Sequence, residues 1–195
     1  MSTRSDNVVR VEGYGPDDVI APREIHHVTF KTNRLDEMIE FYATLTGHQP
    51  TFHGKRFGAA SFDVANHRIA LLQPAPWQEL APEQAALSVG LHHVGYEYDT
   101  LDGLLHTYAR VKRRGIEPEW AVNHGPTLSF YYRDPDGNEI EMQVDTFPDS
   151  AATNDFMRSE AFARNPIGVL VVPEDLIARR AAGEPDSALL RRADT

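Results

Sequence analysis

The chain of 195 residues contains no cysteine. This absence excludes disulfide bonds, thiolate metal sites and cysteine nucleophiles, so a metal ion would have to be held by histidine, aspartate or glutamate. Long hydrophobic runs are also missing, because the longest one, residues 167–172, is far shorter than the roughly 20 residues that cross a bilayer. Residues 1–18 lack a basic start followed by an apolar stretch, so we expect no signal peptide and a cytoplasmic protein.

Positive charge is scarce in this chain. Lysine and arginine number 19 against 29 aspartates and glutamates, which gives a net charge of −10 with histidine neutral. Such a surface repels phosphate backbones and anionic lipids, so we expect neither nucleic acid nor membrane as a partner. The 41% of hydrophobic and 25% of charged residues are typical of a globular protein, and the length suits one compact domain or two small modules that share a core.

The same order of expected elements occurs twice along the chain. In the first occurrence, apolar alternation predicts strands, and helical spacing predicts a helix that Asn33 caps and Gly47 ends. The second occurrence repeats the strand, the helix and the following strands, and Gly115 ends its helix. The expected segments are strand 25–31, helix 35–46 and strands 57–64 and 67–72, then strand 91–98, helix 101–114, strand 118–122 and a hairpin within residues 124–141.

This internal repeat predicts an α+β fold of two side-by-side βαβββ modules. Each module alone would leave one sheet face bare, so the pair would enclose a cleft between the bare faces. We expect the C-terminal extension to pack over the modules, with a short charged helix at residues 173–182 and a frayed end from Gly183. The expected divisions are an N-terminal arm 1–23, a first module 24–75, a linker 76–90, a second module 91–146 and an extension 147–195.

Three polar positions of the repeat are candidates for a metal site. Two His-His-Val segments, residues 26–28 and 92–94, each open an apolar alternating run, and Glu141 lies in the strand that returns from an Asp-Pro-Asp-Gly turn. Strand alternation directs His27 and His93 away from the apolar strand face, and Glu141 alternates with its apolar neighbours in the same way. Two histidines and one carboxylate would form a facial set of three metal ligands with open positions opposite.

The chain resembles the vicinal oxygen chelate superfamily, which includes glyoxalases, bleomycin resistance proteins and dioxygenases. The resemblance lies in the repeated unit, the His-His-Val openings and the closing Asp-Pro-Asp-Gly-Asn-Glu-Ile-Glu. The likeness covers residues 24–145, and more specifically the chain is similar to small type I extradiol dioxygenases of the biphenyl-2,3-diol 1,2-dioxygenase kind. It implies that His27, His93 and Glu141 bind Fe(II), with Mn(II) as the alternative. It also implies that His124 and Tyr131 are catalytic, because residues at these positions contact the substrate or the oxygen-derived intermediate in the family.

The implied reaction is Fe(II)-dependent extradiol, or meta, cleavage of a catecholic aromatic compound by O₂ in the cleft. Trp120 and Phe130 are expected to line that cleft. His26 and His92 are expected to support the ligands rather than to bind metal, and their convergence on the site in place of His27 or His93 would change the ligand set. A homodimer or higher homo-oligomer is expected because small repeats of this kind leave sheet edges exposed.

Two other functions stay open. A divalent-metal isomerase or lyase of the glyoxalase or epimerase kind usually has a fourth ligand, but near the equivalent place, residues 71–73, only Gln73 is polar. A metal-free binding protein of the same fold would need neither the paired histidines nor the glutamate.

One feature departs from the family pattern. Two-domain relatives carry an acid-base histidine about a dozen residues before the ligand of the second module, whereas the linker here has Trp77, Gln78 and Glu79. His67 could reach the cleft or be a solvated turn residue. The other histidines, His48, His53 and His106, are expected on the surface.

Overall fold

A computed structural model describes residues 25–63, 65, 68–73, 76 and 91–194. The expected N-terminal arm lies outside the described residues, as do nearly all of the linker and His67. Each module follows the expected order of a strand, a helix and further strands, and a mainly helical extension comes after them. The predicted α+β fold of two βαβββ modules is therefore confirmed.

The first module is a four-stranded sheet with one helix. Its strands are β1 Val28–Lys31, β2 Phe52–His53, β3 Phe57–Ala60 and β4 Ile69–Leu72, in the order β1-β4-β3-β2, and β1 is parallel to β4. Helix α1, Leu35–Thr46, buries its predicted apolar face and ends at Gly47, whose φ of 78° costs a glycine little. The predicted Asn33 cap is wrong: Arg34 is the cap residue, and its N–H donates to Thr32 Oγ1 at 2.8 Å.

The second module is a five-stranded sheet in the order β5-β8-β7-β6-β9. Its strands are β5 His93–Glu97, β6 Trp120–Asn123, β7 Thr127–Arg133 and β8 Glu139–Asp145, and β9, Val169–Leu170, comes from the C-terminal extension. Helix α3, Leu101–Lys112, begins after Thr100, whose Oγ1 accepts from Gly103 N at 3.1 Å. The helix ends at Lys112 rather than Arg114, because the N–H of Ile116 donates back to Val111 O and closes the last turn.

The Asp-Pro-Asp-Gly turn joins β7 to β8 as predicted. Asp134 is 4% exposed, and its Oδ1 accepts hydrogen bonds from Asp136 N at 3.0 Å and from Asn138 N at 2.8 Å. Gly137 supplies the positive φ that the turn needs, 82°. The buried carboxyl group thereby holds the turn in one conformation, and the conformation of a hairpin turn fixes the register of its two strands.

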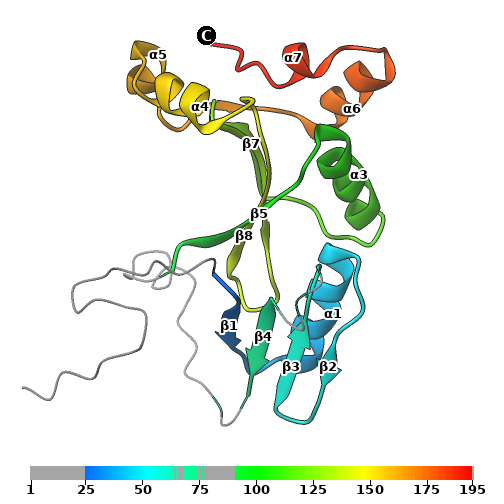
Figure 1. Ribbon diagram of the computed structural model, residues 1–195. Helices are drawn as coiled ribbons and strands as arrows, with labels where there is room; N and C mark the ends of the chain where they lie inside the picture. The colour runs from blue at the N-terminus through cyan, green and yellow to red at the C-terminus, as the bar shows by residue number, and fades with distance from the viewer. Residues whose placement is uncertain (1–24, 64, 66–67, 74–75, 77–90, 195) are drawn as a thin grey trace, which may run out of the picture.

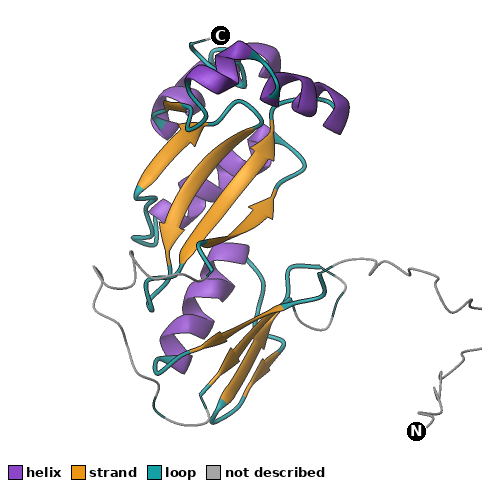
Figure 2. Cartoon of the chain, turned by 90° about the vertical axis from the view of Figure 1, so that its left-hand side faces the viewer, coloured by secondary structure: helices purple, strands orange, loops and turns teal. Residues whose placement is uncertain are grey.

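The two modules lie one above the other in Figure 1, with α1 and α3 on the same side of the sheets. Figure 2 shows the five-stranded sheet face on, with α3 behind it. Hydrogen bonds join the modules, from Tyr42 OH to Asp134 Oδ2 at 3.0 Å and from Arg110 Nη2 to Leu45 O at 2.7 Å. Buried apolar side chains of both modules form one hydrophobic core, so the modules are not independent units.

The C-terminal extension packs at the outer end of the second module (Figure 1). It contains α4 Ser150–Met157, α5 Glu160–Arg164, β9, α6 Pro173–Ala181 and α7 Asp186–Leu189. The predicted helix near residues 173–182 is confirmed, but the predicted fraying from Gly183 is wrong. Leu189 is 2% exposed within the core and Arg192 is 3% exposed, so packing and hydrogen bonds hold this end of the chain.

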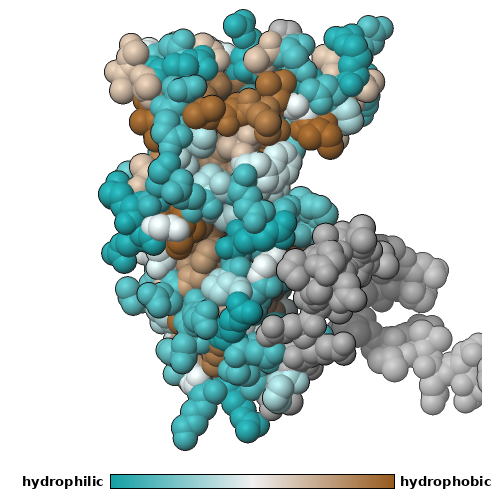
Figure 3. Space-filling model, turned by 180° about the vertical axis from the view of Figure 1, so that it is seen from behind, coloured by the Kyte–Doolittle hydropathy of each residue, from teal (hydrophilic) through white to brown (hydrophobic). Residues whose placement is uncertain are grey.

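The surface of the extension is partly apolar. Its exposed apolar side chains include Ile167, Leu170 and Val172, and Figure 3 shows a hydrophobic area on the upper part of the molecule, where the extension lies. Among the described helices none has the length and hydrophobicity that a membrane crossing requires.

Candidate metal centre and active site

The strand registers confirm that the histidine pairs occupy equivalent places. Val28 pairs with Ile69 in the first module as Val94 pairs with Ile140 in the second, and in each case a parallel first and last strand are involved. Each pair precedes its valine directly. His27 is thus the counterpart of His93, as the repeat predicts.

The β7–β8 hairpin brings Tyr131 next to Glu141. The two residues pair directly across the antiparallel strands, and residues paired in this way have side chains on the same face of the sheet. Tyr131 OH donates a hydrogen bond to Glu141 Oε1 at 2.8 Å. Burial and the Glu141 carboxylate raise the pKa of Tyr131 well above its usual value, so the hydroxyl keeps its proton and acts as a donor.

His93 meets the other oxygen of the same carboxylate. Its Nε2 lies 3.1 Å from Glu141 Oε2, and the Glu141 side chain is only 9% exposed. The two residues come from β5 and β8, which are parallel neighbours. The structure therefore brings together His93 and Glu141, two of the three predicted ligands.

His124 extends this chain of contacts. Its Nε2 lies 2.9 Å from Tyr131 OH, and its Nδ1 contacts the carbonyl oxygen of Ile167 in the extension. Trp120 stacks on Tyr131 with ring centroids 4.4 Å apart, which fixes the plane of the phenol ring. Both residues predicted to be catalytic thus lie in one contact chain, His93–Glu141–Tyr131–His124.

His27 lines a cavity of about 710 Å³ between the modules, to which His93 also contributes. Its Nδ1 lies 3.0 Å from Nδ1 of the neighbouring His26. Most of the cavity wall is apolar or aromatic, and it includes Ile25, Val28, Phe62, Leu91, Val94, Tyr96 and Met142.

The tightest group of potential ligands differs from the predicted one. Within the described residues, the group of three histidine or acidic side chains whose ligand atoms all lie within 4.8 Å is His92, His93 and Glu139. His92 Nδ1 lies 3.3 Å from Glu139 Oε1, a buried atom that accepts no hydrogen bond from the residues that the structure describes. His93 is common to this group and to the predicted set.

Gly95 is a site residue that the sequence reasoning missed. It pairs with Glu141 across β5 and β8, and a Cβ atom at this position would lie 3.3 Å from Glu141 Oε2. Its small size leaves room for the carboxylate above β5. The signal was present in the sequence, because a glycine inside an apolar strand often marks a close approach of another group.

The place in the first module that is equivalent to Glu141 differs from the predicted one. Thr29 pairs with Ala70 in the first module as Gly95 pairs with Glu141 in the second, so Ala70 is the counterpart of Glu141, and residues 71–73 are not. Ala70 has no donor atom in its side chain. The described first module therefore offers no carboxylate or amide at the place equivalent to Glu141.

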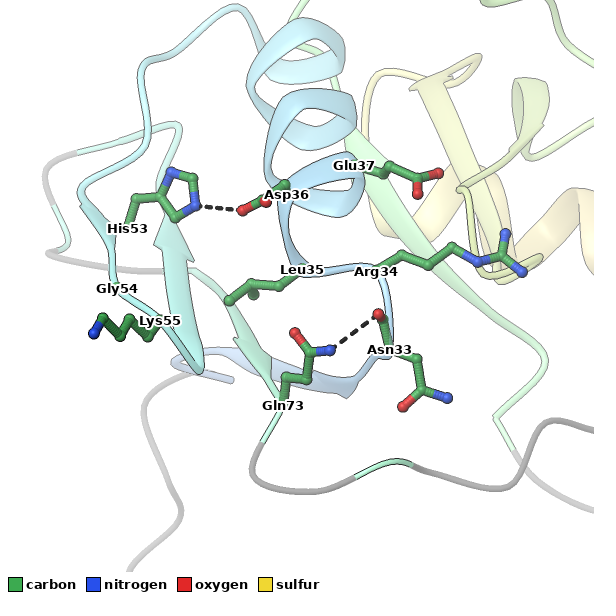
Figure 4. A pocket seen from close by; sticks show the side chains of 9 residues that line it. All are labelled: Asn33, Arg34, Leu35, Asp36, Glu37, His53, Gly54, Lys55 and Gln73. Carbon is green, nitrogen blue, oxygen red and sulfur yellow. Dashed lines mark hydrogen bonds and ion pairs between the residues drawn. The ribbon is translucent and has the colours of Figure 1, made fainter.

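Gln73 instead faces a second cavity, of about 630 Å³, at the start of α1 (Figure 4). Its Nε2 donates to Asn33 O at 3.0 Å, and on the opposite side His53 Nε2 lies 2.7 Å from Asp36 Oδ1. None of the predicted site residues lines this cavity, which is mainly polar.

The prediction that Phe130 lines the cleft is wrong. Phe130 is fully buried in the core and packs edge to face against Tyr108 of α3, with ring centroids 5.6 Å apart. Because side chains alternate along β7, Phe130 faces the helix when Tyr131 faces the site. Trp120 stacks on Tyr131 but is not among the residues that line the cavity between the modules. His48, expected on the surface, is exposed but also lines the cavity between the modules.

Known proteins resemble this chain over most of its length. It is 36% identical over 174 residues to biphenyl-2,3-diol 1,2-dioxygenase 3 of Rhodococcus globerulus, which is 89% of this chain and 90% of that protein. It is 37% identical over 162 residues to biphenyl-2,3-diol 1,2-dioxygenase 2 of the same organism, with 82% of each chain covered.

Among solved structures, a glyoxalase/bleomycin resistance protein/dioxygenase from Alicyclobacillus acidocaldarius superposes with a TM-score of 0.49 at 19% identity, over 72% of this chain and 100% of that one. The family model of the Glyoxalase/Bleomycin resistance protein/Dioxygenase superfamily matches residues 24–142. By this match and by its two Rhodococcus relatives, the chain belongs to the glyoxalase/bleomycin resistance protein/dioxygenase superfamily.

Proposed function

We propose that this protein is an extradiol ring-cleaving dioxygenase, which opens a catecholic aromatic compound with O₂ and uses Fe(II), or alternatively Mn(II). The observation that carries the proposal is the contact chain His93–Glu141–Tyr131–His124, in which a histidine and a carboxylate suited to a metal meet a phenol and a second histidine. The two relatives named as biphenyl-2,3-diol 1,2-dioxygenases support the same reaction class.

The donor atoms fit such a metal. Imidazole nitrogens and a carboxylate suit Fe(II), and two histidines with one carboxylate leave positions open for substrate and oxygen. His93 Nε2 and Glu141 Oε2, 3.1 Å apart, can both reach one ion through bonds of about 2.1 Å. His27, His93 and Glu141 would hold the ion, which when bound supplies the electron transfer between the aromatic ring and O₂ that the protein's own side chains lack.

The side chains around this set have separate tasks. Tyr131 keeps its hydroxyl proton and so orients Glu141 through the hydrogen bond to Oε1. His124 would hold or deliver a proton at Nε2, next to Tyr131, and would stabilise negative charge on a bound substrate oxygen. Trp120 keeps the ring of Tyr131 in place by stacking.

The cavity between the modules suits an aromatic, largely uncharged substrate. Its volume of about 710 Å³ lies in the range of small-molecule sites, and more than half of its lining residues are apolar or aromatic. Phe62 and Tyr96 meet edge to face across the modules with centroids 5.4 Å apart. The Tyr96 hydroxyl itself is buried and makes no hydrogen bond to the described residues.

The rival functions have less support. An isomerase or lyase with four ligands lacks a donor at Ala70, the counterpart of Glu141. A metal-free binding protein would not need a histidine, a carboxylate and a phenol in one chain of contacts.

The direct test is oxygen uptake by protein reconstituted with Fe(II) under anaerobic conditions and then given a panel of catechols, including 2,3-dihydroxybiphenyl. Uptake with a yellow ring-opened product, lost in His93→Ala, is expected. Bound metal without uptake on any catechol would favour the isomerase or lyase, and failure to bind metal would favour the binding protein.

A further inference from the structure

The C-terminal extension contacts the His124 side chain through a backbone atom. The carbonyl oxygen of Ile167 contacts His124 Nδ1, and a carbonyl oxygen can only accept a hydrogen bond. The proton of this contact must therefore sit on Nδ1. Because the Tyr131 hydroxyl proton is donated to Glu141 Oε1, Nε2 faces the Tyr131 oxygen as a hydrogen-bond donor, and its proton is the one that can pass to another group. The extension thus keeps the Nδ1 proton in place and leaves Nε2 as the nitrogen that can take part in chemistry.

The turn that presents this carbonyl is built by Asn165. Its Oδ1 accepts from Gly168 N at 2.9 Å, and its Nδ2 donates to Gly168 O at 2.8 Å, which closes the loop around Ile167. Gly168 has a φ of 104°, and a Cβ atom there would lie 2.2 Å from Asn123 O. The turn thus touches the strand that leads into His124.

Arg192 joins the two segments from the far end of the chain. Its Nη1 donates to His124 O and to Asn165 O, both at 2.9 Å, and its Nη2 donates to Ala161 O at 3.1 Å. One planar guanidinium thus fixes the backbone of His124 relative to the turn that carries the Ile167 carbonyl. A lysine ammonium, a single point charge, cannot reproduce this fork.

The burial of Arg192 argues for a specific role. Its side chain is only 2% exposed, and a buried charge is costly unless it is paired and hydrogen-bonded. Its Nε donates to Asp194 Oδ1 at 2.6 Å, and the guanidinium lies 5.1 Å from the centroid of the Phe156 ring. The neighbouring Arg191 is exposed. These contacts make a rigid support rather than a surface ion pair.

We propose that Arg192 is a positioning residue that, together with the Ile167 carbonyl, holds His124 in place and keeps the proton on its Nδ1. The proposal assigns the C-terminal extension a part in the active site. It rests on the proposed function for its effect on turnover, whereas its effect on His124 can be measured without any reaction.

The test combines Arg192→Lys and Arg192→Ala with Arg191→Ala as the matched control. Nitrogen and proton NMR of labelled histidine, assigned with His124→Gln, should show a protonated Nδ1 of His124 in the wild type and in Arg191→Ala. In both Arg192 variants this signal should shift or disappear through exchange. With Fe(II) and a catechol, kcat should fall about tenfold in Arg192→Lys with KM unchanged, as for other residues that orient a site group.

Guanidinium ion added to Arg192→Ala should restore part of the Nδ1–H signal and of kcat, which a loss of general stability would not allow. If Arg192→Ala does not fold, the Nδ1–H signal of His124 in Arg192→Lys tests the proposal. An unchanged His124 signal in the folded Arg192 variant would overturn the proposal, whatever the activity. An altered signal in a protein that cleaves no catechol would support the positioning role and contradict only the proposed function.

Discussion

Tyr131 and Glu141 lie directly opposite each other in the β7–β8 hairpin, and the phenol donates to Oε1 of the carboxylate at 2.8 Å. This pairing places a hydrogen-bond donor on one oxygen of Glu141 while His93 lies 3.1 Å from the other. Each oxygen therefore has its own partner, and the carboxylate cannot rotate without losing both.

The first prediction concerns this hydrogen bond. Tyr131→Phe keeps the ring that stacks on Trp120 but removes the proton that Glu141 accepts and the oxygen that His124 contacts. We expect kcat for catechol cleavage to fall about tenfold to a hundredfold, measured by oxygen uptake at equal iron content. An unchanged kcat would mean that the hydroxyl has no part in the reaction.

The second prediction concerns the space beside Glu141. Gly95→Val would place branched carbon atoms where the Cβ alone is 3.3 Å from Oε2, so the carboxylate must move. We expect Fe(II) to bind about tenfold more weakly, measured by competition with a chelator. Gly95→Ala should have a smaller effect, because the carboxylate lies at the end of a flexible side chain. Equal iron affinity in both variants and the wild type would contradict a ligand role for Glu141.

The third prediction concerns the contact between the modules. Tyr42 OH donates to Asp134 Oδ2, and both side chains are buried. In a double-mutant cycle with Tyr42→Phe and Asp134→Asn, we expect a coupling of about 1 to 3 kcal/mol in the free energy of unfolding, measured with urea. Additive losses would show that this bond does not connect the modules energetically.

The fourth prediction concerns acid stability. Hydrogen bonds from Lys112 and Tyr108 lower the pKa of Glu174 from 4.5 to about 2. Because the folded state favours the carboxylate, its stabilisation is present above pH 4.5 and is lost as the pH falls toward 2. Glu174→Gln should therefore lower the urea midpoint at pH 7, and the difference from the wild type should shrink between pH 5 and pH 3. A difference independent of pH would contradict this ion pair.

Local patterns were sufficient to predict much of the fold. Helix α1 could be predicted to its last residue, because its apolar face repeats at helical spacing and Gly47 supplies the positive φ at its end. The order of the module elements could be predicted because the chain repeats it. The short strand β2 could not, because two residues carry too little pattern.

The site could be predicted less completely. The alternation of side chains along the strands indicates that His93 and Glu141 lie on the same face of the sheet. The pairing of Tyr131 with Glu141, however, depends on the turn whose conformation the buried Asp134 holds. The support of His124 by Arg192 joins residues 68 positions apart and leaves no periodic signal. The ligand set His27, His93 and Glu141 stays a prediction, with His92, His93 and Glu139 as the competing group.

The most direct measurement compares His27→Ala with His92→Ala after anaerobic reconstitution with Fe(II), by bound iron per chain and oxygen uptake on an accepted catechol. We predict that His27→Ala loses bound iron and oxygen uptake, while His92→Ala keeps most of both. The reverse pattern would assign the metal to His92, His93 and Glu139. Full iron binding and uptake in His27→Ala would contradict the proposed centre.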